Sequence, residues 1–155
     1  MPYGQPSNLV DRFCQSIITK DPSIRFAGIA NQMGKLIATA YRAGLQPLMS
    51  LQETEHYTVQ TVLRASTRET FENKIGKQKY AIAVYEKLIR ATIPITSIVK
   101  DANEQKEKKE QHREEQDLKR LYLLISFNTN SDVISILEDK ILPDIKQFEK
   151  GLSVD

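Results

Sequence analysis

The chain has a single cysteine, Cys14, among its 155 residues. One cysteine cannot form an internal disulfide, so the sequence disfavours a disulfide-stabilised secreted domain and favours a reducing compartment. A thiol nucleophile needs a neighbouring base and a lowered pKa. The residues around Cys14 offer no such base, and Phe13 places the cysteine next to the apolar face of a predicted helix. We therefore expect Cys14 to be a packed thiol.

Long apolar runs are also missing from the sequence. No stretch approaches the ~18 residues that a membrane-spanning helix requires. The first eight residues, MPYGQPSN, lack the basic region and following apolar segment of a signal peptide. We therefore expect a cytoplasmic protein with no membrane partner.

The sequence has no cluster of basic residues that would bind a polyanion such as a nucleic acid. The chain has 22 Lys and Arg against 20 Asp and Glu, and the two signs are interleaved almost everywhere. A nucleic-acid-binding domain usually gathers its basic residues on one face, so no nucleic-acid partner is expected. The most charged segment is 101–120, where Leu118 is the one apolar side chain other than alanine. We interpret it as an insertion that projects from a sheet, with a docking segment for a partner as the alternative.

The sequence lacks a phosphate-binding loop, although GIANQMGKL superficially resembles one. Such a loop needs G-x-x-x-x-G-K followed by Ser or Thr and must open a helix. Here five residues separate Gly28 from Gly34, and Leu36 follows Lys35 where a hydroxyl is required. The stretch after Gly34 is also apolar and strand-like. The two glycines are therefore assigned to a β-hairpin.

Candidate metal ligands are scarce. The chain has two histidines, and His112 lies inside the charged segment. Glu53 and His56 are three residues apart and can share a helix face, but two ligands are too few for a closed metal site. We expect no metal, no cofactor and no enzymatic activity.

The apolar periodicity that is present predicts an ordered series of elements. It predicts helices at Ser7–Pro22, Pro47–Ser66 and from Asn130 or Ser131 to Gly151, hairpins at Ile24–Tyr41 and Lys77–Ile95, and a buried strand at Leu121–Phe127. The predicted order is α-β-β-α-β-β-β-α in one domain, 1–155, with the insertion 101–120. Both faces of most strands carry apolar or small residues, so we expect an α+β fold in which helices cover both faces of a single antiparallel five-stranded sheet. Pro143 should kink or restart the last helix.

Two arginines occupy otherwise apolar predicted strands. Arg25 and Arg90 can point into a pocket and bind a carboxylate or phosphate with two parallel hydrogen bonds. Pairing with an acidic residue or exposure to solvent are the alternatives. Tyr57, Tyr80 and Tyr85 can line a pocket or an interface, with core packing as the alternative.

The element order, together with the run FAGIANQMGKLIATA, resembles the roadblock or dynein-light-chain-type domain, a relative of the profilin and longin folds. The resemblance covers most of the chain, excluding 101–120. Sensory PAS and GAF domains begin with similar hairpins. The run FENKIGKQKYAIAVYEKLIRATIPI is also similar to small archaeal proteins, a likeness that carries no function with it.

The resemblance implies a regulatory or scaffolding role. Roadblock-like domains are usually not enzymes; they dimerise through their second helix and the adjoining strand, and they serve small GTPases and motors. Carried onto this chain, the homodimer surface would include Tyr57, Arg64, Tyr80, Ile82 and Val84. A PAS- or GAF-like sensor, which would hold a small ligand between sheet and helix near Arg25 or Arg90, is the alternative.

Overall fold

The computed structural model describes residues 9–96 and 120–154. Its elements are α1 (Leu9–Ile18), β1 (Ile24–Asn31), β2 (Leu36–Tyr41), α2 (Leu51–Arg68), a 3-10 turn (Glu69–Phe71), α3 (Glu72–Ile75), β3 (Ala81–Val84), β4 (Ile89–Ile95), β5 (Leu121–Phe127), α6 (Val133–Ile136), a π-helical turn (Leu137–Ile141) and α7 (Leu142–Val154). The predicted charged insertion lies outside the described residues, apart from its last residue.

The five strands form one antiparallel sheet in the order β2-β1-β5-β4-β3. The apolar run Leu121–Phe127 forms β5, which is buried along its whole length between β1 and β4. A strand with neighbours on both sides and helices on both faces has no solvent-facing position, which explains its continuous hydrophobicity. The predicted α+β architecture is confirmed.

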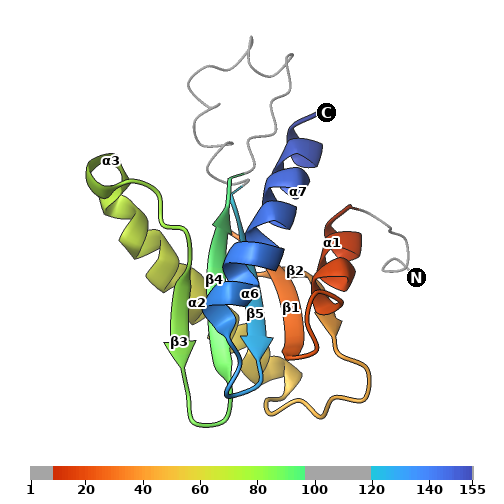
Figure 1. Ribbon diagram of the computed structural model, residues 1–155. Helices are drawn as coiled ribbons and strands as arrows, with labels where there is room; N and C mark the ends of the chain where they lie inside the picture. The colour runs from red at the N-terminus through yellow and green to blue at the C-terminus, as the bar shows by residue number, and fades with distance from the viewer. Residues whose placement is uncertain (1–8, 97–119, 155) are drawn as a thin grey trace.

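Helices cover both faces of the sheet, as Figure 1 shows. Helices α1, α6 and α7 pack on one face, which we call the α1/α7 face, and α2 crosses the other, the α2 face. Alternate residues of a strand point to opposite faces. Leu121, Leu123, Ile125 and Phe127 accordingly belong to the cluster on the α1/α7 face, whereas Tyr122 and Leu124 belong to a separate cluster under α2.

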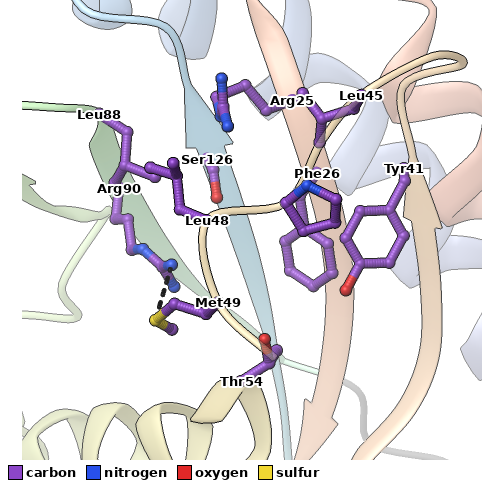
Figure 2. Close-up of a pocket in the computed structure, with 11 residues that line it drawn as sticks. Arg25, Phe26, Tyr41, Leu45, Leu48, Met49, Thr54, Leu88, Arg90 and Ser126 are labelled. Carbon is purple, nitrogen blue, oxygen red and sulfur yellow. Dashed lines mark hydrogen bonds between the residues drawn. The ribbon is translucent and has the colours of Figure 1, made fainter. Parts of the chain in front are cut away.

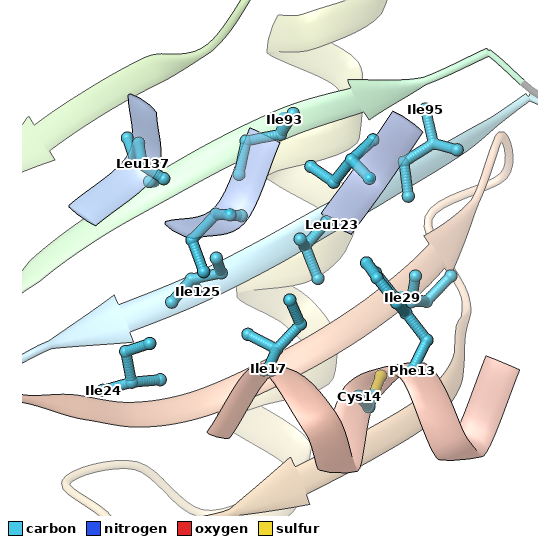
Figure 3. Packing of buried hydrophobic residues seen from close by; sticks show 14 of the residues in the cluster. Phe13, Cys14, Ile17, Ile24, Ile29, Ile93, Ile95, Leu123, Ile125 and Leu137 are labelled. Carbon is cyan, nitrogen blue, oxygen red and sulfur yellow. The ribbon is translucent and has the colours of Figure 1, made fainter. Parts of the chain in front are cut away.

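The α1/α7 face holds the main hydrophobic core (Figure 3). Ile17 of α1, Ile93 of β4 and Leu137 of the π-helical turn are each at most 1% exposed there. Phe13 stacks on Phe148 of α7 with ring centroids 4.1 Å apart. Burial of this kind contributes about 25 cal/mol for each Å² of apolar surface removed from water, so this face supplies most of the stabilising hydrophobic area.

The α2 face is smaller and more polar. Its apolar cluster contains Phe26, Ala30, Val62, Ala65, Tyr122 and Leu124. Helix α2 also buries Thr54, Thr58 and Thr61 against the sheet. The hydroxyl of each threonine donates to the backbone carbonyl four residues earlier, at 2.7 to 2.9 Å. These bonds satisfy the hydroxyls within the helix, so the sheet needs no polar partner for them.

Helix α2 begins at Leu51 rather than at the predicted Pro47. Ser50 caps the helix: its side chain accepts a hydrogen bond from the Glu53 N–H at 3.1 Å, and the Glu53 carboxylate accepts one from the Ser50 N–H at 2.9 Å. This reciprocal capping box defines the start of the helix more strongly than a proline does. Residues 42–50 therefore form a loop between β2 and α2.

The last helix contains Pro143 without ending there. A π-helical turn at Leu137–Ile141 comes immediately before α7, which places the proline at the second residue of the new helical segment. A proline in that position removes no hydrogen bond that the segment needs. Pro143 was expected to kink or restart the helix; the chain instead stays helical through it, with the irregularity in the π-helical turn that comes before. Val133 lies on the buried face of this helix, and its neighbour Ile134 is 58% exposed.

Candidate functional sites

One edge of the sheet is open. Within the described chain β3 pairs only with β4, so one row of its backbone groups has no partner strand. The strand is short, Ala81–Val84, and uncharged. Val84 is 74% exposed and the following Tyr85 is 46% exposed. An apolar edge without charged side chains is a surface on which another strand can add.

The outward face of α2 carries an uncharged stripe, which the exposed residues Glu53, Glu55 and Arg64 flank. Its exposed positions Gln52, His56, Val59, Gln60, Leu63 and Thr67 follow one another at helical spacing. Val59 is 44% exposed and Leu63 is 61% exposed. Depletion of charge at the centre of a surface is a compositional feature of protein interfaces.

Tyr57 joins α2 to the end of the open edge. Its hydroxyl lies 3.3 Å from that of Tyr85, and the guanidinium carbon of Arg90 lies 4.0 Å from its ring centroid. The guanidinium carbon of Arg64, on the same helix, lies 5.9 Å from that centroid. Burial raises the pKa of Tyr57 above its ordinary value and the Tyr85 hydrogen bond adds to the rise, while Arg90 opposes it. Tyr57 is therefore a neutral phenol held between cations.

The five residues that the resemblance implied for a dimer surface lie on both faces of the sheet. Tyr57 and Arg64 are on α2. Ile82 packs against the main core on the opposite face, and the Tyr80 hydroxyl donates to Glu138 at 2.8 Å on that face as well. Val84 lies near the end of the open strand. These residues meet only along the β3 edge, so a single flat helix face would not include all of them. We call the exposed face of α2 together with β3 the α2–β3 surface.

A second site lies on the α2 face, where β1 has a bulge. The pairing of β1 with β5 shifts between Ile24 and Phe26, which leaves Arg25 as the extra residue. Before the bulge Ile24 faces the main core, and after it Ala27 and Ile29 do so. An extra residue in one strand re-aims the neighbouring side chains. Both Arg25 and Phe26 consequently reach the α2 face.

The bulge brings the two strand arginines to one pocket. Arg90 of β4 pairs in register with Ser126 of β5, and Phe26 pairs with the same serine from the other side. Figure 2 shows Ser126 between Arg25 and Arg90, under the loop that carries Leu48 and Met49. This arginine pocket has a cavity of about 30 Å³ and is lined by Arg25, Phe26, Tyr41, Leu45, Pro47, Leu48, Met49, Thr54, Leu88, Arg90 and Ser126.

Neither arginine of the pocket forms an ion pair with an Asp or Glu among the described residues. Arg25 donates to the Asn128 side-chain oxygen at 3.3 Å, and Arg90 approaches the Met49 sulfur at 3.9 Å. Arg42, by contrast, donates to the carbonyls of Asp21 and Ile24, which makes it a structural residue. The sequence singled out Arg25 and Arg90, but the bulge and Ser126 carried no sequence signal.

The structure gives no support to the other candidate sites, a reactive cysteine and a metal site. Cys14 is fully buried, and burial raises the pKa of its thiol to about 12, so it is protonated at neutral pH. The expected packed thiol is confirmed. Among residues 9–96 and 120–154, no group of three or more His, Cys, Asp or Glu is placed to hold a metal ion. In the same part of the chain, no helix combines the length and apolarity needed to cross a membrane.

A larger depression of about 510 Å³ separates β4 from α7. Its acidic residues already have partners within the fold: Glu138 accepts from Tyr80 and pairs with Lys79, and Glu149 accepts from the Thr96 N–H at 2.8 Å. The smaller arginine pocket, whose two arginines have no acidic partner among the described residues, is therefore the better candidate for a binding site.

The arrangement is similar to that of solved structures of the roadblock type. The gliding protein MglB from Thermus thermophilus matches with a TM-score of 0.61 at 9% identity, over 97% of this chain and 90% of that chain. A second MglB structure, with a tetrameric arrangement, matches at 0.60 and 8% identity, over 96% and 90%. A Roadblock/LC7 domain from Streptomyces avermitilis matches at 0.54 and 9% identity, over 91% and 92%.

A ligand-binding domain also shares the architecture at a lower level. The inducer-binding domain of the transcription factor PobR from Acinetobacter, a double mutant in complex with 3-hydroxybenzoic acid, matches with a TM-score of 0.50 at 12% identity, over 96% of this chain and 98% of that chain. No protein-family model matches the chain, and no curated protein matches it. At these identities the likenesses concern the fold alone, and the fold is of the roadblock/LC7 type.

Proposed function

We propose that this chain, which has a roadblock/LC7-type fold, is a non-enzymatic regulatory or scaffolding domain that acts as a homodimer. The observation that carries the proposal is the α2–β3 surface, where an open, uncharged strand edge is linked through Tyr85 and Tyr57 to α2, whose outward face carries an uncharged stripe. Each feature alone is common on monomers. Together they supply unpaired backbone hydrogen-bonding groups and exposed apolar side chains in one place.

The proposed dimer forms by addition of one β3 to the β3 of a second copy. The strands run antiparallel across a two-fold axis, so the two sheets continue into each other and the unpaired backbone groups bond across the axis. The two α2 helices then meet beside the seam through Leu63, which is exposed in the single chain, whereas Val59 lies against Gly34 of the β1–β2 hairpin. Such a seam engages both faces of β3, which accounts for Tyr57 and Arg64 on one side and Tyr80 and Ile82 on the other.

A dimer of this form presents a composite surface that a single chain lacks. The resemblance to roadblock domains implies a small GTPase as the class of protein partner, and the proposed role is to hold or regulate that partner by shape complementarity. The fold supports this class of function, and the partner itself is part of the proposal.

The test is the mass of the protein in solution, measured by light scattering across a concentration series. We expect the wild-type chain to be a dimer and Val84→Asp to be a monomer, because the aspartate adds two like charges at the seam. Ile37→Asp is the matched control: Ile37 is 45% exposed on β2, the edge strand at the opposite end of the sheet. A wild-type chain that stays monomeric, or a Val84→Asp variant that stays dimeric, would rule out this interface.

Val84 is a sharper test position than Ile82. Ile82 is half-buried against the main core, so an aspartate there would disturb the fold as well as the seam. Val84 is 74% exposed and its replacement leaves the core untouched. Unfolding curves of both variants separate a lost interface from a lost fold.

A small-ligand sensor is the second candidate function, and one observation favours it. The structure brings Arg25 and Arg90, from strands on either side of β5, to one pocket. The PobR domain, which shares the architecture, is solved with a hydroxybenzoic acid. In this alternative, ligand binding between sheet and helix changes the stability or the assembly of the chain.

A further inference from the structure

We propose that the arginine pocket binds the carboxylate of a small monocarboxylic acid with an apolar body. The inference rests on the sensor alternative for its biological meaning, but not on homodimerisation. The two guanidinium groups supply the charge, Ser126 supplies a hydroxyl donor between them, and most of the other lining side chains are apolar.

The charge balance of the pocket favours an anion. Two arginines line it, and none of its described lining residues is Asp or Glu. Arg90 is half-buried, with the Tyr57 ring on one side and the Met49 sulfur as a weak hydrogen-bond acceptor. A guanidinium has five N–H donors, so both arginines keep donors available for a ligand. A carboxylate is the planar group that matches this donor geometry.

Ser126 offers a hydroxyl to a ligand on the floor of the pocket. Its residue is only 4% exposed, and its side chain faces the pocket in Figure 2. No described residue accepts from or donates to its hydroxyl. Its oxygen is not among the fully buried atoms that lack a partner, so water in the pocket reaches it, and a ligand oxygen can take the place of that water. A carboxylate oxygen above Ser126 would do so.

The size and walls of the pocket define the ligand class further. A cavity of about 30 Å³ has room for roughly two water molecules, or one carboxylate head, and no more. The apolar body must therefore lie toward the mouth, where Leu48 is 53% exposed and Tyr41 is 43% exposed. These side chains can cover one face of an aromatic ring or a branched aliphatic chain.

A phosphate or an acidic peptide fits the pocket less well. Phosphate sites combine basic side chains with backbone N–H groups. The floor here consists of β1, β5 and β4, which are paired with neighbours on both sides and offer no free backbone edge. For the same reason a peptide cannot add as a strand at this position. A free monocarboxylate needs neither feature.

The experiment uses the full chain with benzoate as the probe and benzamide as its uncharged counterpart of the same shape. Titrations are followed by NMR, through the side-chain resonances of the arginines and the backbone resonances around Ser126. We expect benzoate to shift these resonances and benzamide to leave them in place. Equal responses to the two compounds, stronger binding of inorganic phosphate, or no response to benzoate would each overturn the proposal.

Variants locate the site. We expect Arg25→Gln and Arg90→Gln each to weaken benzoate binding about tenfold, and Ser126→Ala about threefold, because charged hydrogen bonds contribute more than neutral ones. Arg68→Gln is the matched control, since Arg68 is exposed at the end of α2 and lies outside the pocket. If Arg90→Gln fails to fold after losing its contact with Tyr57, Arg25→Gln and Ser126→Ala carry the test. Unchanged affinity in those two would rule out the pocket.

The result for the carboxylate site does not depend on whether either proposed function is correct. Binding is read from the resonances, whether the chain is a monomer or a dimer. If benzoate binds but changes neither the mass nor the melting temperature of the protein, the carboxylate site stands and the sensor role fails. If the chain does not dimerise, the carboxylate site is unaffected.

Discussion

The two faces of the sheet are built from alternate residues of the same strands, yet they differ in chemistry. On β5, Leu123 and Ile125 point into the hydrocarbon core under α1 and α7, whereas Tyr122 and Ser126 point toward α2. The first face consists of closely packed apolar side chains. The second contains hydroxyls, guanidinium groups and a carboxylate, and both candidate sites involve it. The comparison indicates that one face supplies stability and that the other is free to carry recognition.

The polar side chains on the α2 face are tolerated because most of them have partners. The buried Tyr122 hydroxyl donates to Glu69 at 2.8 Å, and Arg120 pairs with the same carboxylate at 2.9 Å. The buried threonines bond within their own helix. The Ser126 hydroxyl has no partner among the described residues, but its oxygen is open to the arginine pocket rather than fully buried.

The largest expected effect tests the apolar face directly. Leu123→Ala should lower the free energy of unfolding by about 3–5 kcal/mol, because it removes a fully buried side chain from closely packed surroundings. Leu124→Ala, one residue along on the α2 face, should cost about 2–3 kcal/mol, since it borders a smaller cluster. Urea unfolding of both variants measures the difference. Equal losses would mean that the two faces contribute alike and would break the comparison.

The second prediction concerns the polar network on the α2 face. Glu69→Ala should cost about 2–3 kcal/mol, because it leaves the buried Tyr122 hydroxyl without its acceptor and leaves Arg120 with the more distant Glu72 carboxylate at 3.6 Å. Tyr122→Phe removes the hydroxyl itself and leaves Glu69 paired with Arg120, so it should cost only about 1 kcal/mol. Both values come from chemical unfolding. A loss for Tyr122→Phe as large as that for Glu69→Ala would contradict the account of the network.

A third, smaller effect measures how closely α2 approaches the first hairpin. Gly34 has a φ of +85°, and an added Cβ would lie 2.9 Å from the Val59 Cα. Gly44 has a φ of +78°, but nothing lies within 4 Å of an added Cβ. Gly44→Ala should therefore cost about 1 kcal/mol for the backbone conformation alone. Gly34→Ala should cost about 2 kcal/mol, since it adds the clash with α2. Equal melting temperatures for the two variants would show that α2 adjusts freely.

Most of the fold could be predicted because its strands are patterned strongly. The alternation through Ile89–Ile95 and the continuous apolar run Leu121–Phe127 correspond to β4 and β5 at the expected residues. The start of α2 was placed four residues early, at Pro47, although the pair Ser50 and Glu53 already had capping-box spacing. The capping-box spacing of Ser50 and Glu53 is thus a better indicator of the helix start than Pro47.

The candidate site could be predicted only in part. Arg25 and Arg90 stood out because a charged residue inside an apolar strand is unusual. Their meeting in one pocket depends on the strand order and on the bulge at Arg25, and neither follows from periodicity. Ser126 gave no signal, since one serine in an apolar strand is ordinary. Long-range pairing, rather than local pattern, created the pocket.

The smallest expected effects come from pH and again separate the two faces. Burial and the hydrogen bond to Glu69 raise the pKa of Tyr122 above its ordinary value of 10.0. The unfolded chain therefore releases this proton first, and stability that is complete below about pH 10 is lost as the pH rises above it. On the α1/α7 face, the Ser23 backbone N–H and then Lys140 lower the pKa of Asp21 below its ordinary value of 3.8. That contribution is complete above about pH 4 and is lost as the pH falls through the folded-state pKa.

Two variants distinguish the alkaline loss of stability from the acid loss. Thermal unfolding is measured from about pH 2.5 to about pH 11.5, a range that spans both ordinary pKa values. Tyr122→Phe should reduce the alkaline fall and leave the acid fall in place, while Asp21→Asn should reduce the acid fall alone, to which Glu138 also contributes. Asparagine can still accept the Ser23 hydrogen bonds, so its effect isolates the charge. Three further groups leave a residual alkaline slope in both variants: the Cys14 thiol, whose pKa burial raises to about 12, and Tyr57 and Tyr80, whose pKa values are also raised. An alkaline fall that Tyr122→Phe does not change would mean that the buried polar network under α2 does not couple to folding, and the chemical contrast between the two faces would then have no energetic counterpart.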